Sequence, residues 1–446
     1  MPMPDLPRQI RLAAGDYFMH GQDARMRQLG LQGNVCRVAV RMDGGFNTAL
    51  LRERVKASPM LNWLARVRIA RPLPVFPAVW RTVDQPGAVL YEHDGREVNG
   101  AGRGQLPPEV MERDLHAGQG AALALDLVRH GDETRQLILS WNHALMDVRG
   151  AELVLRHLNA NGGVKESPTM EDLISPDQMT SSWSRWWANV KIARGSMAWL
   201  RASGREPLFS LVPAGPPAGP CRGQCRVISF SREETTRIEE RCQRLNAGFR
   251  RSHFYLAASL RGLHTVASGR GNKDGAYLAP VPHDIRKRGG TGPIFSNHLS
   301  ILFYRIEPSQ AISLRGIIDE LTRQMMDQVR SRFPECCMAS LEMFKPLPLN
   351  FYVRHLGTPT RGKFSSLCFS DSGESCAGMK ELLGGRIQTV THLVPTWRPP
   401  GLTVLFWSFG GELRALLAWV EDCLSPSEVD VLEQGLRAGL LTEEVP

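Results

Sequence analysis

Hydrophobic and polar positions follow two periods along this chain, one typical of strands and one typical of helices. Predominantly apolar runs at 35–42 and 402–409 predict strands. Apolar residues spaced by three and four predict helices at 47–58 and 314–332. Ser231, followed by Glu234 three residues later, is typical of a capped helix start and predicts a helix to Arg244. The pattern therefore predicts a mixed α/β chain.

The predicted elements fall into two groups, separated by a proline-rich run at 207–220. Proline and glycine interrupt both helices and sheets, so we expect this run to connect two folded parts. With 446 residues, 42% of them hydrophobic, the chain can bury two cores. We expect an N-terminal lobe at 1–165, a helix and linker at 166–220, and a C-terminal lobe at 221–446. In the C-terminal lobe, further strands are expected at 225–230, within 276–306, and at 364–369 and 387–393, with a helix at 253–266 that Ser252 caps.

The linker region contains an aromatic and basic helix pattern at 181–200. Apolar residues spaced by three and four would share one face of that helix, namely Trp183, Trp186, Val190, Ala193, Met197 and Leu200. Such a face can lie on a membrane surface or pack on a protein core. We favour packing on the core, and Gly195 makes the second half of the helix less regular.

Composition narrows the class of protein. No stretch of eighteen or more uncharged apolar residues is present, and the N-terminus lacks a basic start followed by an apolar core, so we expect neither a transmembrane segment nor a secretory signal. The nine cysteines are not arranged as zinc or disulfide frameworks. Reduced thiols are the better interpretation, which favours the cytoplasm and no metal site.

The most informative segment is 137–150, in which His143 and Asp147 lie between a strand at 136–141 and a helix at 151–158. Histidine suits general-base catalysis because its pKa lies close to physiological pH. An aspartate four residues later can orient the loop that presents it. His-x-x-x-Asp alone is a weak signal, so its surroundings decide what it means.

Those surroundings resemble the active-site hairpin of the chloramphenicol-acetyltransferase-like superfamily, which includes condensation domains, wax-ester-synthase-like enzymes and BAHD acyltransferases. The family motif is His-His-x-x-x-Asp-Gly, and here it reads from Asn142 through His143 and Asp147 to Val148. The first histidine is replaced by asparagine and the glycine by valine. Asp284-Ile-Arg286 and the segment from Gly292 to Asn297 are similar to two later family elements, in the family's order.

The resemblance implies two lobes, each a mixed sheet flanked by helices, with a channel between them and His143 as the base. It implies that Asp147 holds the loop through an arginine, either Arg286 or, as in condensation domains, Arg66 or Arg68. Ser370 could contact the oxyanion. His392 lies on a late strand, where a core role is favoured. The candidates for lining the channel are Asn142, Val148, Asn297, Ser300 and Ser370.

The implied activity is acyl transfer from a thioester, carried by coenzyme A or a phosphopantetheinyl carrier protein, to a hydroxyl or amine of a small acceptor. No enzyme nucleophile is needed, which fits the absence of a Gly-x-Ser-x-Gly motif, and no tightly bound cofactor is expected. The alternative is a non-catalytic member that binds a carrier protein or an acyl chain, an interpretation that Val148 supports.

The net charge of +9 allows two interpretations. Only eight of the 54 basic residues are lysine, so the excess of arginine is a matter of general composition or forms a patch that attracts an acidic carrier or coenzyme A. Nucleic acid is not expected, because the arginines are scattered and no nucleic-acid-binding motif is visible.

Overall fold

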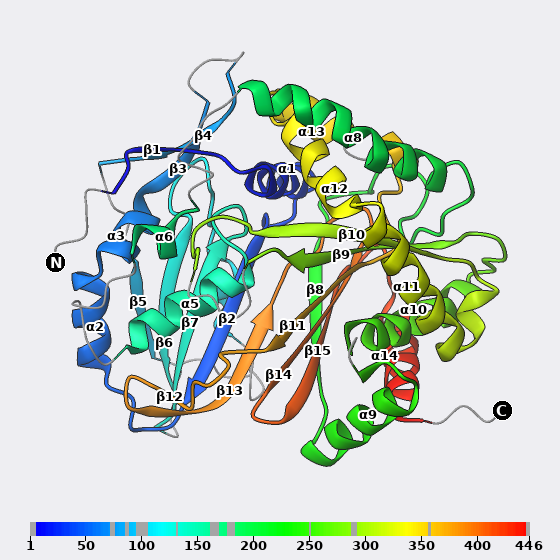
Figure 1. The fold of residues 1–446 in the computed structure, drawn as a ribbon. Coiled ribbons are helices and arrows are strands. Elements are labelled where there is room, and N and C mark those ends of the chain that lie inside the picture. Colours follow the sequence, from blue (N-terminus) through cyan, green and yellow to red (C-terminus); the bar gives the residue numbers. More distant parts are fainter. Residues whose placement is uncertain are drawn as a thin grey trace.

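The computed structural model describes residues 6–71, 76–84, 89–94, 106–130, 133–160, 169–175, 183–248, 251–286, 292–355 and 358–442. They form a mixed α/β structure of two lobes, one built mainly from the first third of the chain and the other from the second half (Figure 1). Each lobe has its own large hydrophobic core. The expected fold class is confirmed.

The N-terminal lobe is built on a six-stranded sheet that is antiparallel except for one parallel pair at its edge. In spatial order its strands are β12 (Glu381–Leu382), β13 (Gly385–Leu393), β2 (Val35–Met42), β7 (Arg135–Asn142), β6 (Leu123–Arg129) and β5 (Leu90–Asp94). A second, three-stranded sheet contains β1 (Gln9–Arg11), β4 (Val79–Thr82) and β3 (Val67–Ala70). The helices of this part are α2 (Thr48–Ala57), α3 (Pro59–Arg66), α4 (Pro108–Met111), α5 (Val148–Asn159) and α6 (Met170–Leu173).

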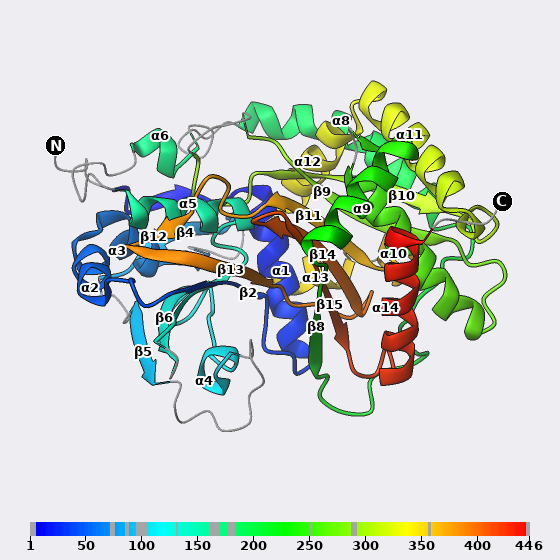
Figure 2. The same ribbon diagram turned by 90° about the horizontal axis from the view of Figure 1, so that it is seen from below.

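The C-terminal lobe has a four-stranded sheet covered by helices on one side (Figure 2). Its strands are, in order, β11 (Cys368–Glu374), β14 (Leu402–Phe409), β15 (Glu412–Val420) and β8 (Gly223–Ser229). An antiparallel pair, β9 (Tyr277–Asp284) and β10 (Leu299–Ile306), extends from this lobe toward the other. The helices are α9 (Arg232–Arg244), α10 (Arg251–Gly269), α11 (Leu314–Arg330), α14 (Pro426–Leu441) and the short 3-10 turn η4 (Gln310–Ile312).

Four further helices and one turn lie around the junction of the lobes (Figure 1). They are α1 (Ala14–Gln28), α8 (Trp183–Ser203), α12 (Phe333–Phe344), α13 (Leu349–His355) and the 3-10 turn η5 (Thr358–Thr360). Helix α8 packs along α12, where the Ser196 and Ser340 hydroxyls lie 2.6 Å apart. Gly195 does not end α8, and its missing Cβ would lie 3.2 Å from the Sγ of Cys336. The α8 pattern thus reflects packing on protein, although the side chains of Trp183 and Trp186 lie outside the described residues.

The lobes are not two contiguous pieces of sequence. β13 pairs with β2, with Val390 opposite Val40, so a late segment completes the N-terminal sheet. The expected C-terminal lobe at 221–446 therefore needs correction at 381–393, which crosses to the other lobe. An alternating strand pattern carries no information about its partner, because any sheet edge with a matching apolar face can accept it.

Three smaller expectations also change. β11 begins at Cys368 and not at 364, so Ser370 lies within the strand. Ser252 lies inside α10, which already includes Arg251, and is not its cap. The proline-rich run is anchored at its start, since Phe209 donates its N–H to the Ala276 carbonyl at 2.9 Å and is buried.

Within the described part of the chain, every helix is too short or too polar to cross a bilayer. All nine cysteines fall in that part as well, and each is a free thiol.

Candidate active site

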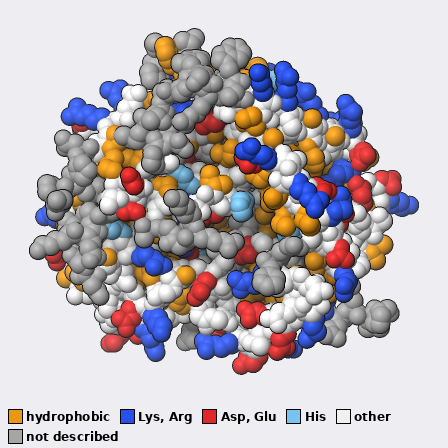
Figure 3. All heavy atoms as spheres, viewed as in Figure 1, with side chains coloured by type: hydrophobic (Ala, Val, Ile, Leu, Met, Phe, Trp, Pro, Cys, Tyr) orange, Lys and Arg blue, Asp and Glu red, His pale blue; other side chains and the backbone are white. Residues whose placement is uncertain are grey.

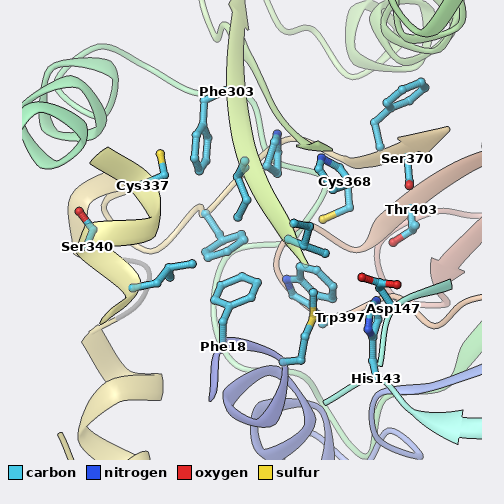
Figure 4. A pocket seen from close by; sticks show the side chains of 18 of the residues that line it. Phe18, His143, Asp147, Phe303, Cys337, Ser340, Cys368, Ser370, Trp397 and Thr403 are labelled. Atoms are coloured by element: carbon cyan, nitrogen blue, oxygen red, sulfur yellow. The ribbon is translucent and has the colours of Figure 1, made fainter. Parts of the chain in front are cut away.

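A cavity of about 810 Å³ lies at the junction of the two lobes and is lined by residues from both. Figure 3 shows hydrophobic side chains around a hollow near the centre of one face of the molecule. Inside it, His143 and Asp147 lie on one side, and Cys337 and Ser340 on α12 lie on the other (Figure 4). The predicted histidine therefore faces a chamber large enough for a small-molecule substrate.

His143 sits in the turn that follows β7, and its backbone is fixed on both sides. Its N–H donates to the Asn34 carbonyl at 2.8 Å, and its carbonyl accepts from Nδ2 of Asn297 at 2.9 Å. Nδ1 is buried without a hydrogen-bond partner among the described residues, and the residue lines the cavity. Burial lowers the pKa of His143 below its ordinary value, more than the nearby carbonyls and Asp147 raise it. A neutral imidazole at neutral pH can accept a proton.

Asp147 holds the loop and does not share a hydrogen bond with His143. Its two carboxylate oxygens accept from the guanidinium of Arg286 at 2.8 and 3.0 Å. They also accept from the backbone N–H groups of Gly150 at 2.9 Å, which caps α5, and of His298 at 3.0 Å. Burial would raise the pKa of Asp147, but Arg286 and these N–H groups lower it on balance, so the group stays ionised.

The partner of Asp147 is thus Arg286, whose side chain is 4% exposed. Its Nε donates to the Pro293 carbonyl at 3.0 Å, which ties the end of β9 to the segment before β10. Arg66 and Arg68 take other partners, since Arg66 donates to the Asn62 carbonyl and Arg68 to the Val67 carbonyl. Of the two arrangements left open by the sequence, the structure has the one with the Asp-x-Arg strand.

Two buried aspartates of α1, which the sequence did not single out, hold the residues on either side of His143. Asp16 accepts from the backbone and side-chain nitrogens of Asn297 at 2.8 and 3.1 Å, and from Trp80 at 3.0 Å. Asp23 accepts from the side chain of Asn142 at 3.0 Å and from the N–H of Asn34 at 2.8 Å. The loop is therefore clamped through two amide side chains.

Three of the five expected channel residues lie behind the cavity wall. Asn142 is fully buried and also donates to the Leu115 carbonyl at 3.0 Å. The side chain of Asn297 donates to Asp16 and to the His143 carbonyl. Ser300 donates to the Pro334 carbonyl at 2.8 Å and is 1% exposed. Their role is to hold backbone, because every one of these polar side chains bonds to protein. A polar residue near a strand end does not indicate, from the sequence alone, whether its side chain lines the cavity or holds the backbone behind it.

Val148 and Ser370 do line the cavity. Val148 is the first residue of α5 and packs against the core of the N-terminal lobe. Ser370 projects from β11, and Thr403 of β14 lies near it (Figure 4). The Thr403 hydroxyl is buried and has no hydrogen-bond partner among the described residues. Thr403 is a further cavity-lining residue that the sequence did not indicate.

Much of the cavity lining is apolar. Phe18 on α1, Phe303 on β10, Leu341 and Phe344 on α12, and Trp397 contribute to it. Such a wall favours a substrate portion with aliphatic or aromatic surface, because burying it releases water.

A second buried polar cluster lies beside the cavity. Nε2 of His392 and the hydroxyl of Ser375 share a hydrogen bond of 2.5 Å, and the same Nε2 lies 3.7 Å from Glu152. Burial lowers the pKa of His392 to about 3 and raises that of Glu152 to about 7. Glu152 also accepts from the N–H of Cys376 at 3.2 Å, so the cluster joins α5 to the end of β11. As expected, His392 is a core residue.

Similarity of this chain to known proteins is found only at the level of three-dimensional structure. No protein-family model and no curated protein matches the chain. The first condensation domain of the calcium-dependent antibiotic synthetase, in complex with a substrate analogue, is similar with a TM-score of 0.69 at 14% identity, over 97% of this chain and 95% of that one. Trichothecene 15-O-acetyltransferase from Fusarium sporotrichioides is similar with a TM-score of 0.68 at 14% identity, over 97% and 96%.

A variant of the starter condensation domain of rhizomide synthetase, in complex with C8-CoA, is similar with a TM-score of 0.63 at 13% identity, over 97% and 94%. The chain has the chloramphenicol-acetyltransferase-like fold. The likeness covers nearly the full length of each chain, so both lobes of this CAT-like fold are present.

Proposed function

We propose that this CAT-like protein is an acyltransferase that moves an acyl group from a thioester to a hydroxyl or amine, with His143 as the general base. The observation that carries the proposal is the position of His143, whose lowered pKa keeps it neutral where it faces the chamber between the lobes. The Asp147–Arg286 pair supports it by holding the loop without taking the histidine's proton.

The proposed reaction needs no group beyond the chain and its two substrates. Nε2 of His143 takes the proton of the acceptor O–H or N–H as that atom attacks the thioester carbonyl. The tetrahedral oxyanion then collapses, the carbon–sulfur bond breaks, and the imidazolium returns the proton to the leaving thiolate. The products are an ester or amide and a free thiol.

The hydroxyl of Ser370 is the candidate for stabilising the oxyanion, since Ser370 lines the cavity. A donor aimed at developing negative charge is effective in a site that excludes water. The apolar wall formed by Phe18, Phe303 and Phe344 would hold an aliphatic or aromatic part of either substrate.

The thioester donor would be coenzyme A or a phosphopantetheinyl carrier protein, a choice supported by the neighbouring starter condensation domain with C8-CoA. The rival proposal, a non-catalytic binder, rests on Val148 in place of the family's glycine. Against it, Val148 and His143 line the same chamber of about 810 Å³, so the valine leaves the histidine accessible.

The test is a screen of acyl-coenzyme A and acyl-N-acetylcysteamine thioesters, from acetyl to dodecanoyl, against a panel of alcohols and amines, with ester or amide formation followed by mass spectrometry. For a productive pair, His143→Ala should lower turnover by roughly 10²–10⁴-fold, as is typical of a lost general base. Ser300→Ala is the matched control and should keep turnover, because Ser300 lies behind the wall.

Wild-type turnover that survives in His143→Ala would remove this histidine from the mechanism. Saturable binding of thioesters without any turnover by the wild type would favour the binder.

A further inference from the structure

The charged residues that line the cavity are divided unequally between its two sides. All four acidic ones, Asp147, Glu152, Asp284 and Asp371, come from the loop before α5, α5 itself, β9 and β11. The lining arginines on that side are paired, Arg286 with Asp147 at 2.8 Å and Arg149 with Glu152 at 3.4 Å.

On the other side, Arg201, Arg205 and Arg361 line the cavity at the end of α8 and just after η5. All three are exposed. Among the residues that the structure describes, their side chains make no hydrogen bond or ion pair. Glu206, the carboxylate that follows Arg205 in the sequence, is paired with Arg305 at 2.8 Å.

These arginines belong to segments that are held together. Helix α8 contacts η5, and the ammonium of Lys363 donates to the Leu208 carbonyl in the segment after α8. Arg361 itself follows η5 in a left-handed conformation, with φ of 53°. Three cations are therefore brought to one rim from two parts of the chain far apart in sequence.

The same wall changes character along α8. Met197 and Leu200 line the chamber, and Arg201 in the last turn of α8 and Arg205 just after its end also line it. A ligand bound along this wall would place apolar atoms against Met197 and Leu200 and an anionic group beyond them. Guanidinium groups without carboxylate partners suit phosphate, which accepts several charge-assisted hydrogen bonds.

We propose that Arg201, Arg205 and Arg361 bind the phosphate at the end of the donor's pantetheine arm, so that the donor enters across the rim formed by the end of α8 and the residue after η5. This inference rests on the proposed function, which supplies the thioester. It also assigns the acceptor to the opposite side of His143, near Val148 and Arg149, because the donor would occupy the α8 side.

The first experiment compares two ligands that differ only in the phosphate, pantetheine and 4′-phosphopantetheine, by calorimetric titration of the full-length protein. The wild type should bind phosphopantetheine at least about tenfold more tightly, the effect expected of one or two charge-assisted hydrogen bonds. The triple variant Arg201→Gln, Arg205→Gln, Arg361→Gln, the rim variant, should lose that preference.

The matched control removes the same number of charges elsewhere, by Lys191→Gln, Arg194→Gln and Arg237→Gln. These residues are exposed and outside the cavity lining, and the first two lie on α8 itself. The control variant should keep the phosphate preference. A preference that persists in the rim variant, or that both variants lose equally, would overturn the proposal.

The second experiment separates this inference from the proposed function. Acyl-coenzyme A carries the phosphate and acyl-N-acetylcysteamine does not, so the ratio of their kcat/KM values should fall about tenfold or more in the rim variant. His143-dependent turnover of acyl-N-acetylcysteamine without any phosphate preference would contradict phosphate binding by the three arginines and leave the proposed function standing. A phosphate preference without acyl transfer would support phosphate binding and contradict the proposed function.

If the rim is supported, 3′,5′-ADP distinguishes the two sources of the phosphate. Competition by 3′,5′-ADP would indicate coenzyme A, whose nucleotide carries further phosphates. Binding of phosphopantetheine that 3′,5′-ADP does not reduce would indicate a carrier protein.

Discussion

Asp147 turns both carboxylate oxygens to the guanidinium of Arg286, at 2.8 and 3.0 Å, and so serves as the anchor of the histidine loop. The pair joins the start of α5 in the N-terminal lobe to the end of β9 from the other lobe. The loop that presents His143 is thereby fixed across the lobe junction, which gives the proposed base a defined position.

Removing either partner of this pair should destabilise the fold because it strands a buried charge. Asp147→Ala and Arg286→Ala should each lower the free energy of unfolding by about 3–5 kcal/mol, and the double variant should lose less than the sum. Asp284→Ala is the control, since Asp284 lies 3.3 Å from the same arginine but is half exposed, and should change stability by about 0–1 kcal/mol. Denaturant titration of the four variants measures this, and strictly additive losses would show that the two residues do not act as a pair.

Gly150 gives a test in which two physical effects have opposite signs. Helix propensity favours alanine over glycine inside α5 by about 1 kcal/mol. However, a Cβ at this position would lie 2.2 Å from the Ile294 carbonyl, so the segment before β10 would have to move. We expect Gly150→Ala to lower the free energy of unfolding by about 1–3 kcal/mol and to reduce turnover.

Gly219→Ala is the control, because nothing lies within 4 Å of its added Cβ. A Gly150→Ala variant more stable than the wild type in thermal unfolding would mean that α5 and residue 294 are not in close contact.

The residues around the histidine illustrate how far the sequence leads. His143 and Asp147 belong to a motif with fixed spacing, and Arg286 belongs to a second family element as one of two alternative partners. The strands at 35–42 and 402–409 are predominantly apolar runs and were found with those limits. Asn142, Asn297 and Ser300 were placed in the right segments but on the wrong side of the cavity wall. A side chain's direction depends on which neighbour offers it a hydrogen bond, and those neighbours are distant in sequence.

Helix α1 was missed for a related reason. Its buried residues include Asp16 and Asp23 together with apolar ones, so nearly every face is covered and no apolar stripe appears. Those two aspartates are needed to hold Asn297 and Asn142, which are 281 and 119 residues away. An acidic residue in an otherwise apolar run, as in Ala13-Ala-Gly-Asp-Tyr17, was the available signal. The crossing of β13 to the other lobe had no local signal.

Glu152 should make stability depend on pH in a defined direction. Its pKa is raised by burial to about 7 from an ordinary 4.5, so the folded protein favours the protonated form. The associated stabilisation is complete below pH 4.5 and is lost as the pH rises through 7. Glu152→Gln does not titrate, so relative to the wild type it should gain up to about 3 kcal/mol between pH 5 and pH 8.

Urea unfolding at both pH values measures the difference. His392 and Arg149 face Glu152 and are present in both proteins, so their own effects largely cancel. A difference that is constant or falls with pH would contradict the burial of an ionisable Glu152.

Val148→Gly tests the departure from the family motif. Val148 lies at the start of α5 and on the cavity wall, so the change removes bulk from the chamber and weakens the first turn of the helix. We expect the wild type to be active and the variant to be equal or worse in acyl transfer. A variant that gains turnover from a barely detectable background would identify the native protein as a blocked enzyme.

The central claim is that neutral His143 takes the acceptor's proton, and the pH dependence of kcat/KM tests it most directly. Because burial lowers the pKa of His143 from 6.5, the acid limb of the wild-type profile should have its midpoint below pH 6.5. The residual activity of His143→Ala should lack that limb. An acid limb that is unchanged in His143→Ala would show that another group takes the proton and would contradict the account.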